Sequence, residues 1–204
     1  MKHMKKAEQP KMYENPLLEI LSISGPKMMV TFHILISSSS LIYGYSLLGT
    51  SATGIMLVGF FIAGFASWSL AEYILHRHLF HYESNNKFVK AFHFAMHGYH
   101  HENPNDVNRL FMPPVPAFLF LAVFFLLFYV LLGNYAWFFL PGFEIGYLLY
   151  SFVHYSIHKH SAPKPLQKIW NHHIIHHYKE PEKAYGVSSR VWDRIFRTMP
   201  DSEK

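Results

Sequence analysis

The 204-residue chain contains no cysteine. This absence excludes disulfide bonds, thiolate zinc sites and iron–sulfur clusters, so histidine and carboxylate are the metal ligands that remain. Charged residues are also scarce: they make up 15% of the chain, whereas a typical soluble domain has about 25%. Half of the residues are apolar and 18% are aromatic. This length and composition indicate a single-domain membrane protein.

The formal net charge of +5 at pH 7 raises the question of a nucleic-acid partner. The basic residues are spread over three polar segments, and no nucleic-acid-binding motif accompanies them, so this partner is not expected. A phospholipid surface fits the charge better.

Four hydrophobic stretches each approach the roughly 20 residues that a helix needs to cross a bilayer. They are Met28–Leu48, Gly54–Leu75, Val115–Leu132 and Tyr135–Val153. Short turns at 49–53 and 133–134 join them in pairs. We therefore predict an all-α membrane protein with four transmembrane helices in two hairpins. Residues 28–204 form the domain, and residues 1–27 form a cytosolic or interfacial segment.

Within that segment, Asn15 and Pro16 resemble the capped start of a short interfacial helix, with a loose tail as the alternative. The orientation follows from lysine and arginine: five precede the first stretch, four lie in the central segment, nine follow His158, and the hairpin turns have none. By the positive-inside rule both termini and the central segment are cytoplasmic. All histidine clusters then lie on that side.

Ten of the sixteen histidines fall into four clusters beside the hydrophobic stretches. The clusters are His76/His81, His97/His100/His101, His154/His158 and His173/His176/His177. An isolated histidine pair is more often solvated or buried in a core than a ligand, but four clusters on one membrane face predict a metal centre. Ten imidazoles exceed what one ion accepts, so we expect two ions. Iron, zinc and copper all accept nitrogen ligands, and about five imidazoles per ion suit a pair of irons better than four-coordinate zinc.

Helical spacing predicts how the clusters are shared. Residues three or four apart lie on one face of a helix, as His154 and His158 do. In the pattern H-x-x-H-H the first and third histidines align and the middle one turns about 100° away, so each triplet can reach two metals. His76 and His81 lie roughly 140° apart on an ideal helix, and we expect the helix to unwind there.

The other polar residues near these clusters have less certain roles. His3, His78, His93, His160 and His172 are expected at the surface or supporting a ligand, and His33 is expected to be packed and hydrogen-bonded. Glu72, one turn before His76, is a candidate acceptor for its ring. Glu144, inside the last apolar stretch, must be paired, interfacial or functional.

Five motifs then carry a resemblance to a known family. They are the segments Glu72–His81, His93–His101, Arg109–Ala117, His172–His177 and Tyr185–Phe196. Over about residues 68–200 the chain resembles the catalytic domain of fatty acid 2-hydroxylases, within the membrane fatty acid hydroxylase and sterol desaturase superfamily.

The resemblance implies a four-helix membrane fold whose cytosolic cap holds a dimetal centre, diiron when active, with zinc able to substitute in purified protein. It implies a monooxygenase that uses dioxygen and external electrons to hydroxylate carbon 2 of a long fatty acid or of the acyl chain of a sphingolipid such as ceramide. By the same resemblance, one metal takes His76, His81, His97, His101 and His176, and the other takes His100, His154, His158, His173 and His177. Many eukaryotic members begin with a haem-binding cytochrome domain. Residues 1–27 are too short for one, so a separate electron-transfer protein is the expected donor.

No side chain beyond the metal ligands is expected to be catalytic, because the C–H bond is too strong for side-chain acid–base chemistry. Tyr99, Arg109 and Lys168 are candidates for binding the lipid head group, although such residues often serve only as interfacial anchors. The alternatives are another oxidation of the superfamily (carotenoid or sterol hydroxylation, lipid desaturation), a histidine-based metal transporter, and a non-catalytic metal-tied scaffold. The 185–196 motif favours the fatty acyl branch. A transporter places ligands near the bilayer midplane, where this chain is nearly pure Leu, Phe, Val and Ile.

Overall fold

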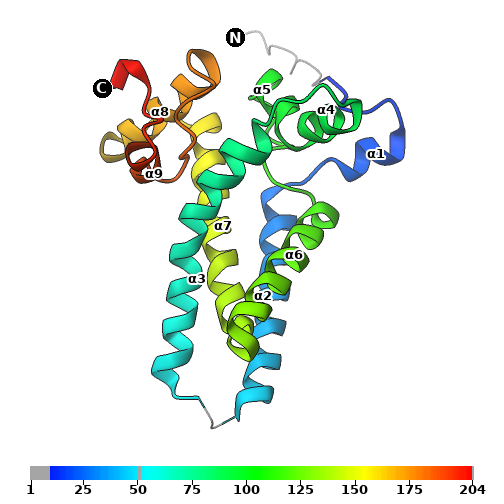
Figure 1. Ribbon diagram of the computed structural model, residues 1–204. Helices are drawn as coiled ribbons and strands as arrows, with labels where there is room; N and C mark the ends of the chain where they lie inside the picture. The colour runs from blue at the N-terminus through cyan, green and yellow to red at the C-terminus, as the bar shows by residue number, and fades with distance from the viewer. Residues whose placement is uncertain (1–9, 50–51, 204) are drawn as a thin grey trace, which may run out of the picture.

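The computed structural model describes residues 10–49 and 52–203, and in these ranges it contains helices and connecting segments but no β-strand. Four long helices stand beneath a cap of shorter ones (Figure 1). The long helices are α2 (Pro26–Leu48), α3 (Gly54–Ile74), α6 (Pro114–Leu132) and α7 (Ala136–Lys159). The shorter helices are α1 (Pro16–Leu21), α4 (Lys87–His93), α5 (Tyr99–Glu102), α8 (Gln167–Tyr178) and α9 (Val191–Ile195). The all-α class is confirmed.

The hydrophobic stretches and the long helices nearly coincide. α7 continues past Val153 to Lys159, and so it carries two predicted ligands into the cap. The 3₁₀ turn η4 (Gly133–Tyr135) joins α6 to α7. Residues 50 and 51 of the other expected turn lie outside the described residues.

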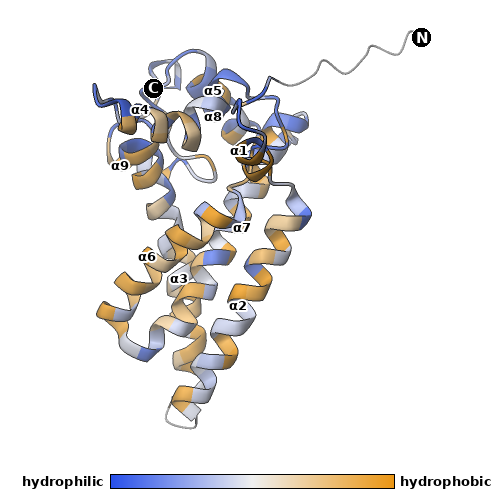
Figure 2. Ribbon diagram, turned by 90° about the vertical axis from the view of Figure 1, so that its right-hand side faces the viewer, coloured by the Kyte–Doolittle hydropathy of each residue, from blue (hydrophilic) through white to orange (hydrophobic). Residues whose placement is uncertain are grey.

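Three helical runs in the described part of the chain are long and apolar enough to cross a membrane: Pro26–Leu48, Gly54–Phe80 and Pro114–Lys159. The third run, 46 residues long, contains both α6 and α7. Figure 2 shows apolar residues predominating along the long helices and polar residues gathered in the cap. Large side chains such as Ile55 are exposed on the outside of the bundle, at 87% in this case, as expected of a surface that faces lipid. The chain is therefore a multi-pass membrane protein.

Prolines and a polar cap begin several of these helices. Pro16, Pro26 and Pro114 occupy first-turn positions, where a missing amide donor has no consequence. The side chain of Asn15 accepts hydrogen bonds from the backbone amides of Leu17 (2.9 Å) and Leu18 (3.2 Å). The predicted capped helix is confirmed, and the loose tail is wrong for this stretch.

α7 packs against the other three long helices, and its approach to α3 is especially close. A Cβ atom on Gly64 would lie 2.0 Å from the carbonyl oxygen of Phe139, and one on Gly142 would lie 1.9 Å from the carbonyl oxygen of Phe61. Only glycine at both positions lets the two backbones touch. Because α3 leads into His76 and α7 carries His154, this contact sets the separation of two histidine clusters.

Glu144 lies inside the bundle and is completely buried. Its carboxylate accepts hydrogen bonds from Nδ1 of His33 (3.0 Å) and the hydroxyl of Ser37 (2.5 Å). The sequence left Glu144 as paired, interfacial or functional, and in the structure it is paired. His33 is packed and hydrogen-bonded, as predicted.

Candidate metal centre

His76 and His81 leave the membrane helix on a π-helix, η2 (Leu75–Phe80). The spacing predicted that the helix unwinds here. Instead, the helix widens to i→i+5 hydrogen bonds, and the amide of His81 donates to the carbonyl of His76 (3.2 Å). The wider turn brings residues five apart onto one face, and the two ring centroids lie 5.0 Å apart. The predicted unwinding is wrong because it assumed ideal α-helical geometry. A second π-helix, η3 (Phe94–Gly98), carries His97.

The ten clustered histidines converge in two groups at the cap end of the bundle. The first group contains His76, His81, His97, His101 and His176; the second contains His100, His154, His158, His173 and His177. Within each group, one nitrogen from every ring lies within 4.8 Å of the others. The grouping in space is the one that the family resemblance implied. In each H-x-x-H-H triplet the middle histidine joins the other group, as the helical offset predicted.

The nitrogen spacings fit a metal ion at the centre of each group. In the second group five Nε2 atoms form a chain in which neighbours lie 2.9–3.0 Å apart, in the order His154, His100, His177, His173, His158. An imidazole nitrogen offers a single in-plane hydrogen or lone pair, so the three middle nitrogens cannot bond to both neighbours. Two nitrogens at right angles around an ion 2.0–2.1 Å away are about 3 Å apart, whereas tetrahedral ligands are about 3.4 Å apart. The spacing therefore suits an ion with five or six ligands.

The first group shows the same pattern. Nε2 of His97 lies 2.9 Å from Nε2 of His76 and 3.0 Å from Nε2 of His101. Nε2 of His81 and of His176 are buried without a hydrogen-bond partner among the described residues. Both are available as ligand atoms.

Burial keeps these imidazoles uncharged. It lowers the pKa of His97, His100 and His173 well below the usual range, and neighbouring imidazoles add to the effect. Burial likewise lowers the pKa of His176 to about 3 and that of His101 to about 4. A neutral ring is the form that binds a metal, so the protein holds the rings ready for ligation.

A loop between α8 and α9 orients two ligands of the first group. Nδ1 of His76 donates to the carbonyl of Tyr185 (2.6 Å), and Nδ1 of His176 donates to the carbonyl of Lys183 (2.7 Å). Both rings must then carry their hydrogen on Nδ1, which leaves the Nε2 lone pair for an ion.

Two buried carboxylates hold this loop. Asp193 accepts from the amides of Tyr185 (2.9 Å) and Gly186 (2.8 Å), from the Thr198 hydroxyl (2.7 Å) and from Nε2 of His172 (3.1 Å). His172 therefore supports the site, one of the two roles expected for it.

Glu72 is the second of these carboxylates. It accepts from the amides of Val187 (2.7 Å) and Ser188 (2.8 Å) and from the Ser188 hydroxyl. The expectation that Glu72 bonds to the ring of His76 is thus wrong, because the carbonyl of Tyr185 takes that ring nitrogen.

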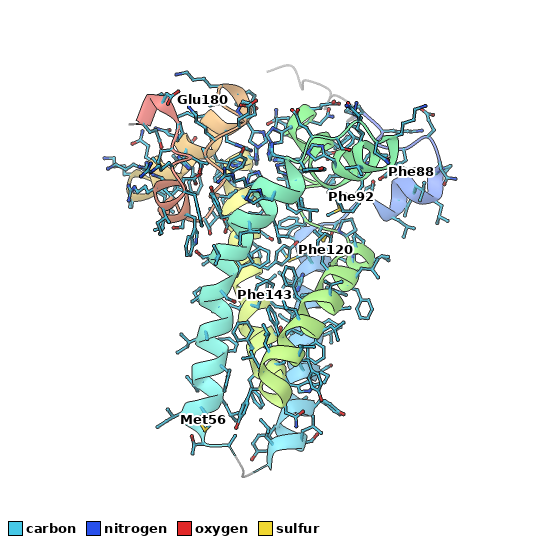
Figure 3. The ribbon with its side chains drawn as sticks, viewed as in Figure 1. Met56, Phe88, Phe92, Phe120, Phe143 and Glu180 are labelled. Carbon is cyan, nitrogen blue, oxygen red and sulfur yellow. The ribbon has the colours of Figure 1, made fainter. Side chains whose placement is uncertain are left out.

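A cavity of about 450 Å³ adjoins both groups and runs down into the bundle. Its wall includes His97 of the first group and His100 of the second. Further lining comes from Phe92 of α4, Phe120 of α6 and Phe143 of α7, which Figure 3 labels at successive depths. The cavity is mainly apolar, as a lipid-binding site is, and the histidines lie at its cap end.

The three candidate head-group residues have different surroundings. Tyr99 and Arg109 line the cavity, whereas Lys168 is exposed on α8 and is not part of the lining. The guanidinium of Arg109 bonds to Asp106 and Glu19, and its Nε donates to the hydroxyl of Ser22 (3.1 Å). Its charge is thus neutralised by two carboxylates, and it fastens α1 to the central segment.

The chain is similar in sequence to proteins of known function. A family model described as fatty acid hydroxylase matches residues 61–198. Fatty acid 2-hydroxylase of Homo sapiens is 38% identical over 134 residues, which cover 62% of this chain and 35% of the human protein. The ceramide very long chain fatty acid hydroxylase of Saccharomyces cerevisiae is 40% identical over 136 residues, 63% of this chain and 35% of the yeast protein. The dihydroceramide fatty acyl 2-hydroxylase of Arabidopsis thaliana is 35% identical over 129 residues, 62% of this chain and 54% of the plant protein.

The fold is also similar to a solved structure. Full-length scs7p, of which only the hydroxylase domain is visible, matches with a TM-score of 0.84 and 28% sequence identity, covering 94% of this chain and 72% of that one. The chain matches about a third of the length of the human and yeast relatives, at 35% of each.

Proposed function

The chain belongs to the fatty acid hydroxylase family, as its motifs indicated, and we propose that it hydroxylates carbon 2 of a long acyl chain, in a fatty acid or a ceramide. The observation that carries the proposal is the contact between the cavity and the two histidine groups, because it puts an apolar lipid chain beside a metal pair. The names of the human, yeast and plant relatives support the acyl substrate, and those of the human and plant relatives support attack at carbon 2.

In this proposal each histidine group holds one iron ion. When bound, the irons supply the activation of dioxygen and the oxidising strength that side chains lack. The reaction also consumes two electrons, which we assign to a separate electron-transfer protein. The distance of about 3 Å between neighbouring ligand nitrogens matches ligands at right angles around an ion rather than at tetrahedral angles, which favours iron over structural zinc.

The side chains of the protein position the substrate. Tyr99 directly precedes His100, and its ring lines the cap end of the cavity beside Arg109. The head group of the lipid lies at this polar end, and the tail follows the apolar wall toward Phe143. Carbon 2, next to the head group, is then the carbon nearest to the histidines. The apolar wall also excludes water from the reacting carbon.

Product analysis tests this proposal. A host that carries the protein and an electron donor is fed saturated acids of different lengths, and the new oxygen is located by mass spectrometry. We expect the hydroxyl on carbon 2 at every length, because extra carbons extend only into the apolar part of the cavity. A double bond, or a hydroxyl at another carbon, would contradict 2-hydroxylation and indicate a desaturase or a different hydroxylase.

We further propose that α6 and α7 cross the membrane separately, which gives four crossings with both termini in the cytoplasm. The two ends of the described chain meet the cap: the carbonyl of Pro10 accepts from Tyr99 (2.6 Å), and Glu203 accepts from His172 (2.8 Å). Single-cysteine labelling at position 134 tests the topology, since the chain has no cysteine of its own. We expect an impermeant reagent to reach position 134 from outside only. Labelling from the cytoplasmic side alone would overturn the topology.

A further inference from the structure

Helix α9 lies where the cap meets the bundle, against the cap-side end of α3 (Figure 1). Nε1 of Trp192 on α9 donates to the hydroxyl of Ser69 on α3 (2.7 Å). The ring of Phe196, which directly follows α9, stacks on the ring of Tyr73 with centroids 5.1 Å apart. Ser69 lies five residues before the end of α3, about 7.5 Å along the helix. α9 therefore lies at the level where a membrane-spanning helix reaches the cap.

The face of α3 that α9 covers is exposed to lipid farther down. Ile62 and Phe65 are exposed, and they precede Ser69 by seven and four residues. At about 100° per residue, these three positions fall within about 60° of one another around the helix. Phe65 lies about 6 Å and Ile62 about 10 Å below Ser69. A phospholipid whose acyl chains lie along these two side chains therefore has its head group at α9.

The outward side of α9 combines apolar and cationic side chains. Val191, Arg194 and Ile195 are exposed, and their spacing of three and four residues puts them on one face of the helix. Val191 and Ile195 are 49% and 58% exposed. At a membrane boundary such apolar side chains enter lipid, while an arginine keeps its charge among the head groups. α9 thus has the surface of a helix that rests on a membrane.

Two arginines at this place are free to bind an anion. Arg109 and Arg190 pair with carboxylates, whereas Arg194 and Arg197 form no ion pair with the described residues. Arg197 is exposed, and its φ of 60° lies in the left-handed region, which favours glycine or asparagine over arginine. A guanidinium binds phosphate through paired N–H groups. Two such groups beside an apolar surface match an anionic lipid head group.

We propose that Arg194 and Arg197 bind the phosphate of an anionic phospholipid in the leaflet that adjoins the cap, with its acyl chains along Ile62 and Phe65 of α3. An anionic lipid is preferred over a zwitterionic one, because a choline cation is repelled by the two arginines. α9 also carries Asp193, so this lipid is bound by the helix that supports the first histidine group.

Native mass spectrometry tests this site without turnover. The metal-loaded protein is kept in micelles with equal amounts of phosphatidylglycerol and phosphatidylcholine, and the spectrum gives the fraction of protein that retains each lipid. One arginine near a lipid surface contributes roughly fivefold to binding. We therefore expect a preference for phosphatidylglycerol of roughly 25-fold in the wild-type protein. Arg194→Gln and Arg197→Asn should each lower it roughly fivefold, and asparagine keeps the left-handed backbone favourable.

Lys179→Gln is the matched control, because it removes one exposed cation elsewhere on the cap. Lys179 adjoins Glu180, which Figure 3 shows at the far end of the cap from the bundle. This variant should keep the preference, and an equal loss in it would overturn the site. Equal retention of both lipids by the wild-type protein, or an unchanged preference in the Arg194→Gln/Arg197→Asn double variant, would also overturn it. Displacement of the lipid by an equal concentration of inorganic phosphate would contradict a phospholipid site and indicate a general anion site.

Discussion

The two histidine groups have the same size, but different parts of the fold hold them. In the first group, His76 and His176 are each fixed by a carbonyl of the 183–188 loop, and the buried carboxylates of Glu72 and Asp193 hold that loop. In the second group, Nδ1 of His154, of His173 and of His177 is buried without a protein partner in the described ranges. Their directions come from helix packing alone.

The two groups should therefore lose metal affinity in response to different changes. A metal-bound imidazole is normally oriented by a hydrogen bond from its other nitrogen. The first group has this support at two of its rings, so it is sensitive to changes in a distant loop. The second group lacks this support at three of its rings and is sensitive mainly to changes in the ligands themselves.

Removing a ligand of the second group should have the largest effect. His100→Ala and His177→Ala should each abolish hydroxylation, because no other side chain in the group can replace the lost nitrogen. His160→Ala is the control: its ring is exposed, and its hydrogen bonds come from its backbone, whose amide donates to the carbonyl of Ser156 (2.9 Å) and whose carbonyl accepts from Trp170 (3.1 Å). Activity in membranes and metal content measure the outcome. Equal loss in the control would indicate general sensitivity of folding rather than ligation. The same tolerance is predicted for His3→Ala, although His3 lies outside the described residues.

A change in the loop support should separate the two groups. Asp193→Asn puts an amide where Asp193 accepts hydrogen bonds, which loosens the carbonyls that orient His76 and His176. We expect metal affinity of the first group to fall by about 10- to 100-fold, while the second group keeps its ion. Metal titration of the metal-free protein gives the two affinities.

Glu144→Gln serves as the matched control, since it alters a buried carboxylate in the bundle that touches no ligand. It should leave both affinities unchanged. A parallel loss of both ions in Asp193→Asn would contradict the difference between the groups.

The smallest effect is expected at Arg109, which fastens α1 over the cavity without touching either group. Arg109→Gln weakens its bonds to Glu19 and Asp106, so we expect KM for the lipid to rise by roughly tenfold or less, with kcat and the metal content preserved. Lys168→Ala, on the exposed face of α8, should change neither constant. Loss of an ion in Arg109→Gln would show that α1 also supports the metal centre.

Most of the helical framework was predictable because one property decides it. A run of about 20 apolar residues must be helical in lipid, and proline or glycine at its ends limits its length. The division of the triplets between two groups was equally predictable, since it follows from the angle between neighbouring residues on a helix. The sequence could not decide among the alternative roles of Glu144, because its partner His33 lies 111 residues away in sequence.

Other features of the site could not be predicted from the sequence. The π-helix at His76 depends on hydrogen bonds that shift from i+4 to i+5, and a spacing of five residues does not distinguish this from unwinding. The role of Asp193 could not be predicted because Asp193 acts on His76 indirectly. It accepts from the amide of Tyr185, and the carbonyl of Tyr185 accepts from the ring of His76. The partner of Glu72 was predicted wrongly because the sequence shows that His76 lies one turn away on the same helix, but not that the backbone amides of Val187 and Ser188 lie nearby.

The count of metal ions per chain tests the central claim most directly. The protein is expressed with ample iron, purified without a histidine tag and subjected to elemental analysis together with protein quantification. Ten converging imidazoles predict two ions per chain, and zinc in place of iron would still agree with the site. One ion or none per chain would contradict the dimetal centre.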